Sequence, residues 1–111
     1  MSELKDKINA DKVAAMKAKD EMALSTLRMA LAAIQTEEVA GKVARELSDA
    51  DVLAVLNREV AKRRDSAEAY TTGNRPELAA KELAEVEVLQ RYLPAALSDE
   101  ELDAIVTAAL A

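Results

Sequence analysis

Cysteine and histidine are absent from the 111-residue sequence, and glycine, proline and aromatic residues occur only twice each. The lack of cysteine excludes disulfides and thiolate chemistry, and the lack of histidine removes the commonest acid–base side chain. Zinc sites built from thiolate and imidazole ligands are excluded as well. Gly41 and Gly73 stand far apart, so no glycine-rich phosphate loop can form. The sequence therefore predicts no cofactor and no catalytic residue of the nucleophile–base type.

Carboxylates are the one kind of metal ligand that remains. Glu85 and Glu87, or the run Asp99, Glu100 and Glu101, could offer oxygen ligands to magnesium. Acidic residues are also common in the first turn of a helix and on its solvated face, and this ordinary interpretation has more weight. We therefore assign no metal site.

The abundant residues are helix formers. Alanine and leucine dominate the sequence, and half of its residues are hydrophobic. Two glycines and two prolines are too few for a strand-rich sandwich or barrel with its many turns. The length suits one domain, expected over residues 1–111. The predicted fold class is all-α, a bundle-like domain of five helices arranged as antiparallel hairpins.

Capping signals and hydrophobic spacing place the five helices at about residues 3–19, 21–40, 48–72, 76–93 and from 98 onward. Gly41 and Gly73 are expected to end the second and third helices. The residues expected at the N-terminal ends are Ser2, Asp20, Ser48 with Asp51 in a capping box, Pro76, and Ser98 with Glu101 in a second box. The side chains expected to face inward are Leu4, Ile8, Ala15 and Met16; Leu24, Leu27, Leu31 and Ile34; Val52, Val55, Leu56 and Val60; Leu78, Val86 and Leu89; and Leu102, Ile105, Val106 and Leu110.

The net charge is −6, and most of the acidic excess follows residue 64. The chain thus lacks the broad basic field that drives non-specific binding to nucleic acid, so any such contact needs a local basic cluster. The polar start of the sequence does not resemble a secretory signal, and no apolar run approaches the ~20 residues of a membrane span. These features predict a cytoplasmic location and no membrane partner.

Charged residues occupy positions where the apolar stripes of two helices should continue. The stripe of the third helix runs on from Val60 to Arg63 and Tyr70, and that of the fourth includes Glu82 and Glu85. In an antiparallel hairpin these groups would meet, so we predict semi-buried ion pairs that fix the register of the two helices. The tyrosine hydroxyl would lie near the turn, within reach of a polar partner.

Basic residues cluster around the same point. Successive helical residues turn by about 100°, so Lys62, Arg63 and Arg64 cannot all face the neighbouring helix. At least one of them must point to solvent, where a cation is most often simply hydrated. The alternative is a phosphate- or partner-binding patch made of Arg58, Lys62, Arg64 and Arg75.

An extended pattern resembles a known family. The stretches "REVAKRRDSAEAYTTGNRPELAAKELAEVEVLQRYLP" (58–94), "LSDEEL" (97–102) and "LRMALAAIQTEEV" (27–39) are similar to the GatB/YqeY family. The resemblance covers nearly the whole chain. It implies an N-terminal helical domain, normally followed by a smaller helical tail domain that we do not expect to find within residues 1–111.

The resemblance also implies a functional context. The tail domain is shared with the B subunit of glutamine-dependent tRNA amidotransferase, in which it contacts tRNA. The family accordingly has the label of a carbon–nitrogen ligase with glutamine as amido donor. Because the sequence lacks a recognisable nucleophile and nucleotide site, catalysis by this chain alone is not expected.

Three functions therefore stay open. The first is a non-catalytic accessory module that binds tRNA weakly, or binds an amidotransferase or another translation-related protein. The second is participation in glutamine-dependent ligation, and the third is a structural protein-interaction domain without a role in RNA binding. The sequence does not indicate an oligomeric state.

Overall fold

The computed structural model describes residues 2–94, and these form four α-helices joined by turns and loops. The helices are α1 (Glu3–Ala18), α2 (Glu21–Glu38), α3 (Asp49–Thr72) and α4 (Pro76–Gln90). The all-α prediction is confirmed, but the described part of the chain has four helices where the sequence suggested five. The expected fifth helix, with Leu102, Ile105, Val106 and Leu110, lies outside the described residues.

The predicted caps explain where the first three helices begin. The hydroxyl of Ser2 accepts the N–H of Lys5 at 3.0 Å, and the carboxylate of Asp20 accepts the N–H of Ala23 at 3.2 Å. A complete capping box opens α3, with hydrogen bonds running both ways between Ser48 and Asp51. Each cap satisfies backbone donors that have no partner within the helix.

The helix ends differ slightly from those expected. Pro76 is in the first turn of α4 and Gly73 caps α3, as predicted, but α2 ends at Glu38, before Gly41. In the α3–α4 turn, Asn74 takes the left-handed backbone conformation with φ 60°, while Gly73 has φ −81°. Asparagine tolerates this region better than most residues because its short amide can bond locally.

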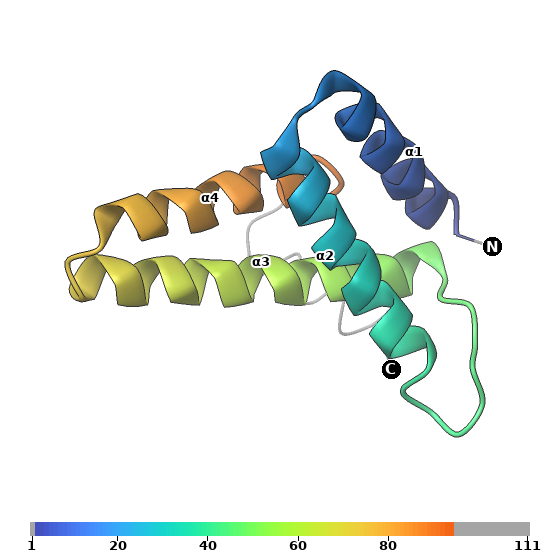
Figure 1. Cartoon of the computed structure of the whole chain (residues 1–111). Coiled ribbons are helices and arrows are strands. Elements are labelled where there is room, and N and C mark those ends of the chain that lie inside the picture. Colours follow the sequence, from blue (N-terminus) through green and yellow to red (C-terminus); the bar gives the residue numbers. More distant parts are fainter. Residues whose placement is uncertain (1, 95–111) are drawn as a thin grey trace.

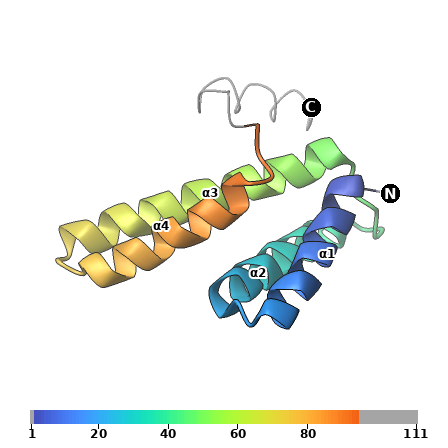
Figure 2. The same ribbon diagram turned by 90° about the horizontal axis from the view of Figure 1, so that it is seen from above.

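The four helices pack as two antiparallel hairpins. α1 pairs with α2 and α3 with α4, and the first hairpin lies across the second (Figure 1). Seen from above, the two pairs lie next to one another (Figure 2). α2 and α3 each contact the other three helices. The largest fully buried side chains are Ile8, Ile34, Leu47, Leu56, Leu89, Val52, Val88 and Thr26.

Two residues expected in the core are exposed. Met16 is 51% exposed and Leu78 is 38% exposed. Leu78 follows the α3–α4 turn, which lies away from the first hairpin, so no second layer from residues 2–94 covers it (Figure 1). Ala15, which was also expected to face inward, is buried at the end of α1. The spacing rule identifies the apolar stripe of a helix, but only its neighbours decide how much of that stripe is covered.

Candidate functional site

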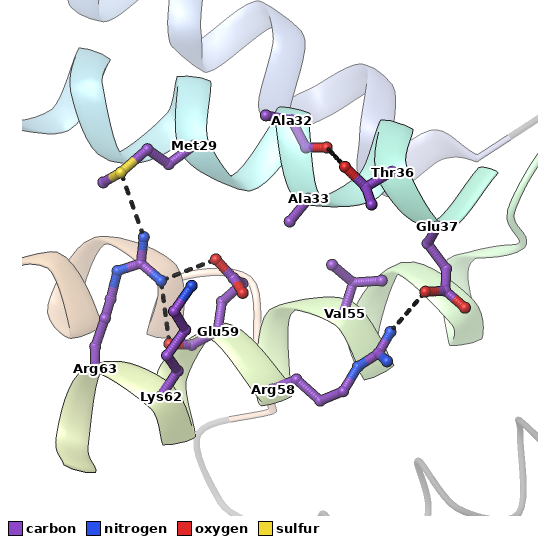
Figure 3. Close-up of a pocket in the computed structure, with 10 residues that line it drawn as sticks. All are labelled: Met29, Ala32, Ala33, Thr36, Glu37, Val55, Arg58, Glu59, Lys62 and Arg63. Carbon is purple, nitrogen blue, oxygen red and sulfur yellow. Dashed lines mark hydrogen bonds and ion pairs between the residues drawn. The ribbon is translucent and has the colours of Figure 1, made fainter. Parts of the chain in front are cut away.

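A hollow of about 500 Å³ lies between α2 and α3, and we call it the α2–α3 groove. Its floor is partly apolar. Both helices contribute carboxylates to its rim, whereas the basic groups come from α3 (Figure 3). α3 contributes residues three and four positions apart, which lie on one face of a helix. The lining residues are Met29, Ala32, Ala33, Thr36 and Glu37 from α2, and Val55, Arg58, Glu59, Lys62 and Arg63 from α3.

The buried guanidinium of Arg63 forms one end of the groove. Its Nε donates to Oε1 of Glu85 on α4 at 3.1 Å, and one terminal nitrogen donates to Oε1 of Glu59 at 3.0 Å and to the Glu59 carbonyl at 3.1 Å. Its other terminal nitrogen lies 3.8 Å from the sulfur of Met29 on α2. Arg63 is 6% exposed and Glu85 is 7% exposed. One side chain thus links three helices, with its charge balanced by carboxylates on two sides.

Arg58 and Lys62 belong to the predicted basic patch, and both line the groove. The Arg58 guanidinium donates to Oε2 of Glu37 at 3.3 Å, across the groove from α3 to α2 (Figure 3). Lys62 rises from α3 toward the space between the helices, and within residues 2–94 its ammonium has no carboxylate partner (Figure 3). Among the described residues that line the groove, Lys62 is therefore the cation that can meet an anionic or polar ligand.

The other two members of the predicted patch lie elsewhere. Lys62 and Arg64 are two positions apart in α3, so they project about 200° from one another. Arg75 caps α4 at the far end of the second hairpin. Arg58 and Thr72, the last residue of α3 before the α3–α4 turn, are separated along the helix by roughly 20 Å at ~1.5 Å per residue. The structure brings together Arg58 and Lys62 but does not place Arg64 and Arg75 beside them.

The predicted contact between the third and fourth helices is made by one acidic residue. Glu85 pairs with Arg63, whereas Glu82 is half-buried and forms no ion pair within residues 2–94. Tyr70 is half-buried near the turn, and its carbonyl accepts the N–H of Arg75 at 2.7 Å. Two partners in the groove were not predicted, Glu59 and Glu37. The first could have been found from the i,i+4 spacing of Glu59 and Arg63.

The groove has few groups suited to chemistry. Its one hydroxyl, that of Thr36, donates to the carbonyl of Ala32 at 2.9 Å (Figure 3). Its carboxylates, Glu37 and Glu59, are engaged by arginines. Within the described residues no acidic cluster could hold a metal ion, and the acidic run at 99–101 lies outside them. No helix in that same range is long and apolar enough to cross a membrane.

Two further contacts join parts of the chain that are distant in sequence. The hydroxyl of Tyr92, after α4, donates to Oδ2 of Asp11 on α1 at 2.5 Å. Burial, together with the hydrogen bond and charge of Asp11, raises the pKa of Tyr92 above its ordinary value of 10.0. The hydroxyl of Ser2 donates to Oδ1 of Asp49 at 2.6 Å, and this bond is the main reason why the pKa of Asp49 lies below its ordinary 3.8.

Comparison with known proteins assigns a family. The family model described as "Yqey-like protein" matches residues 5–111. Altered inheritance of mitochondria protein 41, mitochondrial, from Saccharomyces cerevisiae strain S288c is 35% identical over 98 residues, which cover 86% of this chain and 51% of the yeast protein. The protein of the same name from Lachancea thermotolerans is 31% identical over 96 residues, covering 84% and 50%. The chain thus spans about half the length of the curated relatives it matches.

These relatives also correct one expectation. They are named as mitochondrial proteins, so the cytoplasmic location expected from the sequence is wrong by this comparison. The resemblance seen in the sequence, by contrast, is confirmed by a match that begins at residue 5 and runs to the last residue. The chain belongs to the YqeY-like protein family.

Proposed function

We propose that this chain is a helical binding module that serves tRNA-dependent amide transfer, the reaction that the sequence resemblance implies, without being catalytic itself. The α2–α3 groove is the observation that supports the binding part. Its end is fixed by the buried contacts of Arg63, and Lys62 presents an ammonium without a carboxylate partner in the described chain. A preformed hollow with one available cation suits an anionic or polar group of a partner, because little ordering is needed on binding.

The chemistry of the chain supports a non-catalytic role. Amide transfer from glutamine requires a nucleophile and a site that activates the acceptor carboxylate. The sequence has neither cysteine nor histidine, and the groove's hydroxyl and carboxylates already have partners. We expect the purified chain to release no ammonia from glutamine in the presence of nucleotide, magnesium and mischarged tRNA. Release above background that a point substitution in this chain abolishes would refute this part of the proposal.

A structural protein-interaction domain is the second candidate. The partly apolar floor of the groove, with Met29, Ala33 and Val55, and the net charge of −6 favour it, since both features suit a protein surface better than RNA. The two candidates differ in whether RNA is needed for the partner to be recovered.

A pull-down from native lysate, with and without ribonuclease, separates the two. The proposal expects tRNA, together with an amidotransferase or another translation-related protein, and expects ribonuclease to reduce the recovery of that protein. Recovery should also fall for Lys62→Gln and stay unchanged for Lys42→Gln, which removes an exposed cation from the α2–α3 loop. A protein that is recovered equally well after ribonuclease, with no tRNA bound, would establish the second candidate instead.

A further inference from the structure

A second hollow, of about 480 Å³, lies between α1 and α2, and we call it the α1–α2 hollow. It is more polar than the α2–α3 groove and contains three basic side chains, two carboxamides and one carboxylate. The residues that line it are Lys5, Asn9, Lys12, Arg28, Leu31, Ala32, Gln35 and Glu38. In a chain with a net charge of −6, this is a local excess of positive charge.

Helix periodicity explains why these groups converge. Lys5, Asn9 and Lys12 are spaced by four and three residues, so they lie along one face of α1. Arg28 and Gln35, seven residues apart, lie along the facing side of α2. The two helices are antiparallel neighbours, as the contact between the start of α1 and the end of α2 requires. The polar faces of α1 and α2 therefore flank this open hollow on two sides.

Of the three cations, only Lys5 forms an ion pair with a carboxylate of the described chain. The ammonium of Lys5 donates to both carboxylate oxygens of Glu38, at 3.1 and 2.8 Å, and this pair closes one end of the hollow. Neither Lys12 nor Arg28 forms an ion pair with any carboxylate of residues 2–94. Two like charges that face the same hollow repel one another, and an anion between them would turn this repulsion into attraction.

We propose that the α1–α2 hollow binds a phosphate group, held by the ammonium of Lys12 and the guanidinium of Arg28. The guanidinium fork matches two phosphate oxygens, and the carboxamide of Gln35 adds a neutral donor. The volume of about 480 Å³ lies within the range of small-molecule sites. The phosphate could come from a free polyphosphate or from a nucleic-acid backbone, which share this chemistry. The inference goes beyond the proposed function, because it requires neither tRNA nor a protein partner.

The test measures binding of pyrophosphate to the whole chain by calorimetry, at constant ionic strength, with tRNA as a separate arm. The variants are Lys12→Gln and Arg28→Gln, and the matched control is Lys17→Gln, an exposed cation of α1 outside the hollow. We expect each hollow variant to weaken binding by about tenfold, and the control to leave it within about twofold.

Thermal unfolding provides a readout that does not depend on calorimetry. Pyrophosphate should raise the Tm of the parent and of Lys17→Gln, because a ligand that binds only the folded state stabilises it. The rise should be lost in Lys12→Gln and Arg28→Gln, although these variants melt no lower than the parent without ligand, since each removes a repulsive charge. This comparison separates a lost site from a failure to fold.

Each outcome decides the proposal. Binding of pyrophosphate that only the two hollow variants weaken supports it, even if the pull-down recovers no tRNA. Binding of tRNA alone, with the same dependence on Lys12 and Arg28, supports it with the backbone as the source of phosphate. Binding of neither ligand, or equal weakening by Lys17→Gln, overturns it.

Discussion

Arg63 of α3 donates a hydrogen bond to Glu85 of α4 at 3.1 Å, and less than a tenth of either residue is exposed. The same guanidinium bonds Glu59 one turn earlier in α3 and faces the sulfur of Met29 on α2. The contact therefore fixes the register of the second hairpin and its docking on the first. It also holds one end of the α2–α3 groove in place, so its loss should affect both stability and binding.

Removal of the Glu85 carboxylate should strongly destabilise the fold. Glu85→Ala leaves the buried guanidinium with half of its charge compensation, and breaking a buried pair in this way costs about 3–5 kcal/mol. Glu85→Gln keeps a hydrogen-bond acceptor and should cost less, and the double change Arg63→Met with Glu85→Leu should recover most of the loss. Urea unfolding measures these differences in the free energy of unfolding.

Glu82→Ala is the control, since Glu82 has no ion pair in the described chain and its removal should cost no more than about 1 kcal/mol. An equal loss from Glu82→Ala would refute the special role of Glu85.

The contact between Tyr92 and Asp11 should make stability depend on pH in the alkaline range. The folded state raises the pKa of Tyr92, so this contribution is complete below the ordinary value of 10.0 and is lost as pH rises above it. At pH 7, Tyr92→Phe should cost about 1 kcal/mol, because the hydroxyl donates to a carboxylate at a partly exposed site. The difference in unfolding free energy between parent and variant should shrink by pH 11.

Tyr70→Phe is the matched control for this experiment. The Tyr70 hydroxyl has no hydrogen-bond partner in residues 2–94, so its removal should change stability little at either pH. The comparison cancels the titration of lysines, which all variants share. A parent–Tyr92→Phe difference that is the same at pH 7 and pH 11 would contradict the prediction.

The bond from Ser2 to Asp49 should affect stability in acid. Hydrogen bonds from the Ser2 hydroxyl and the Leu4 N–H lower the pKa of Asp49, so its stabilising effect is present above the ordinary 3.8 and is lost as pH falls through the lower, folded value. Ser2→Ala should move the titration midpoint of the Asp49 carboxyl upward, as followed by NMR. Ser48→Ala removes a comparable N-cap from α3 but leaves the Ser2 bond intact, so it should destabilise without moving that midpoint as far. Equal shifts in the two variants would count against the assignment.

Features that depend on neighbouring residues in the sequence were predicted well. The N-caps at Ser2, Asp20 and Ser48 follow from a side chain and a backbone donor three residues apart, so no tertiary information is needed. The contact of Arg63 with α4 was also foreseeable, because a short turn forces two helices with interrupted apolar stripes to face one another.

Features that depend on the crossing of the two hairpins were not predicted. The exposure of Leu78 reflects where the second hairpin leaves the first, and the choice of Glu85 over Glu82 reflects which side of α4 faces Arg63. The bond from Tyr92 to Asp11 joins residues 81 positions apart. The α1–α2 hollow was overlooked although its signal was present, since Lys5 and Lys12 share a helix face.

The sequence grouped Arg58, Lys62, Arg64 and Arg75 as one basic patch. These residues should contribute unequally to any contact with nucleic acid. Each phosphate contact adds about one unit to the slope of log affinity against log salt. Lys62→Gln should flatten the slope for tRNA by about one unit, whereas Arg75→Gln should leave it unchanged, because Arg75 lies at the far end of the second hairpin. Binding itself should be no tighter than the ~10⁻⁴ to 10⁻⁶ M of non-specific contacts at physiological salt.

Arg58 provides a test in which a substitution should strengthen tRNA binding instead of weakening it. Its guanidinium is held by Glu37 across the groove at 3.3 Å, so in the parent it is only partly available to a phosphate. Glu37→Gln removes the competing charge, and it should strengthen tRNA binding and steepen the salt slope by about one unit. The additional change Arg58→Gln should remove that gain, while Glu37→Gln with Arg75→Gln should keep it.

Filter binding or fluorescence anisotropy over a range of salt concentrations measures the tRNA affinity of all these variants. If Arg75→Gln reduces the slope as much as Lys62→Gln, and Glu37→Gln has no effect, the phosphate contact lies outside the α2–α3 groove.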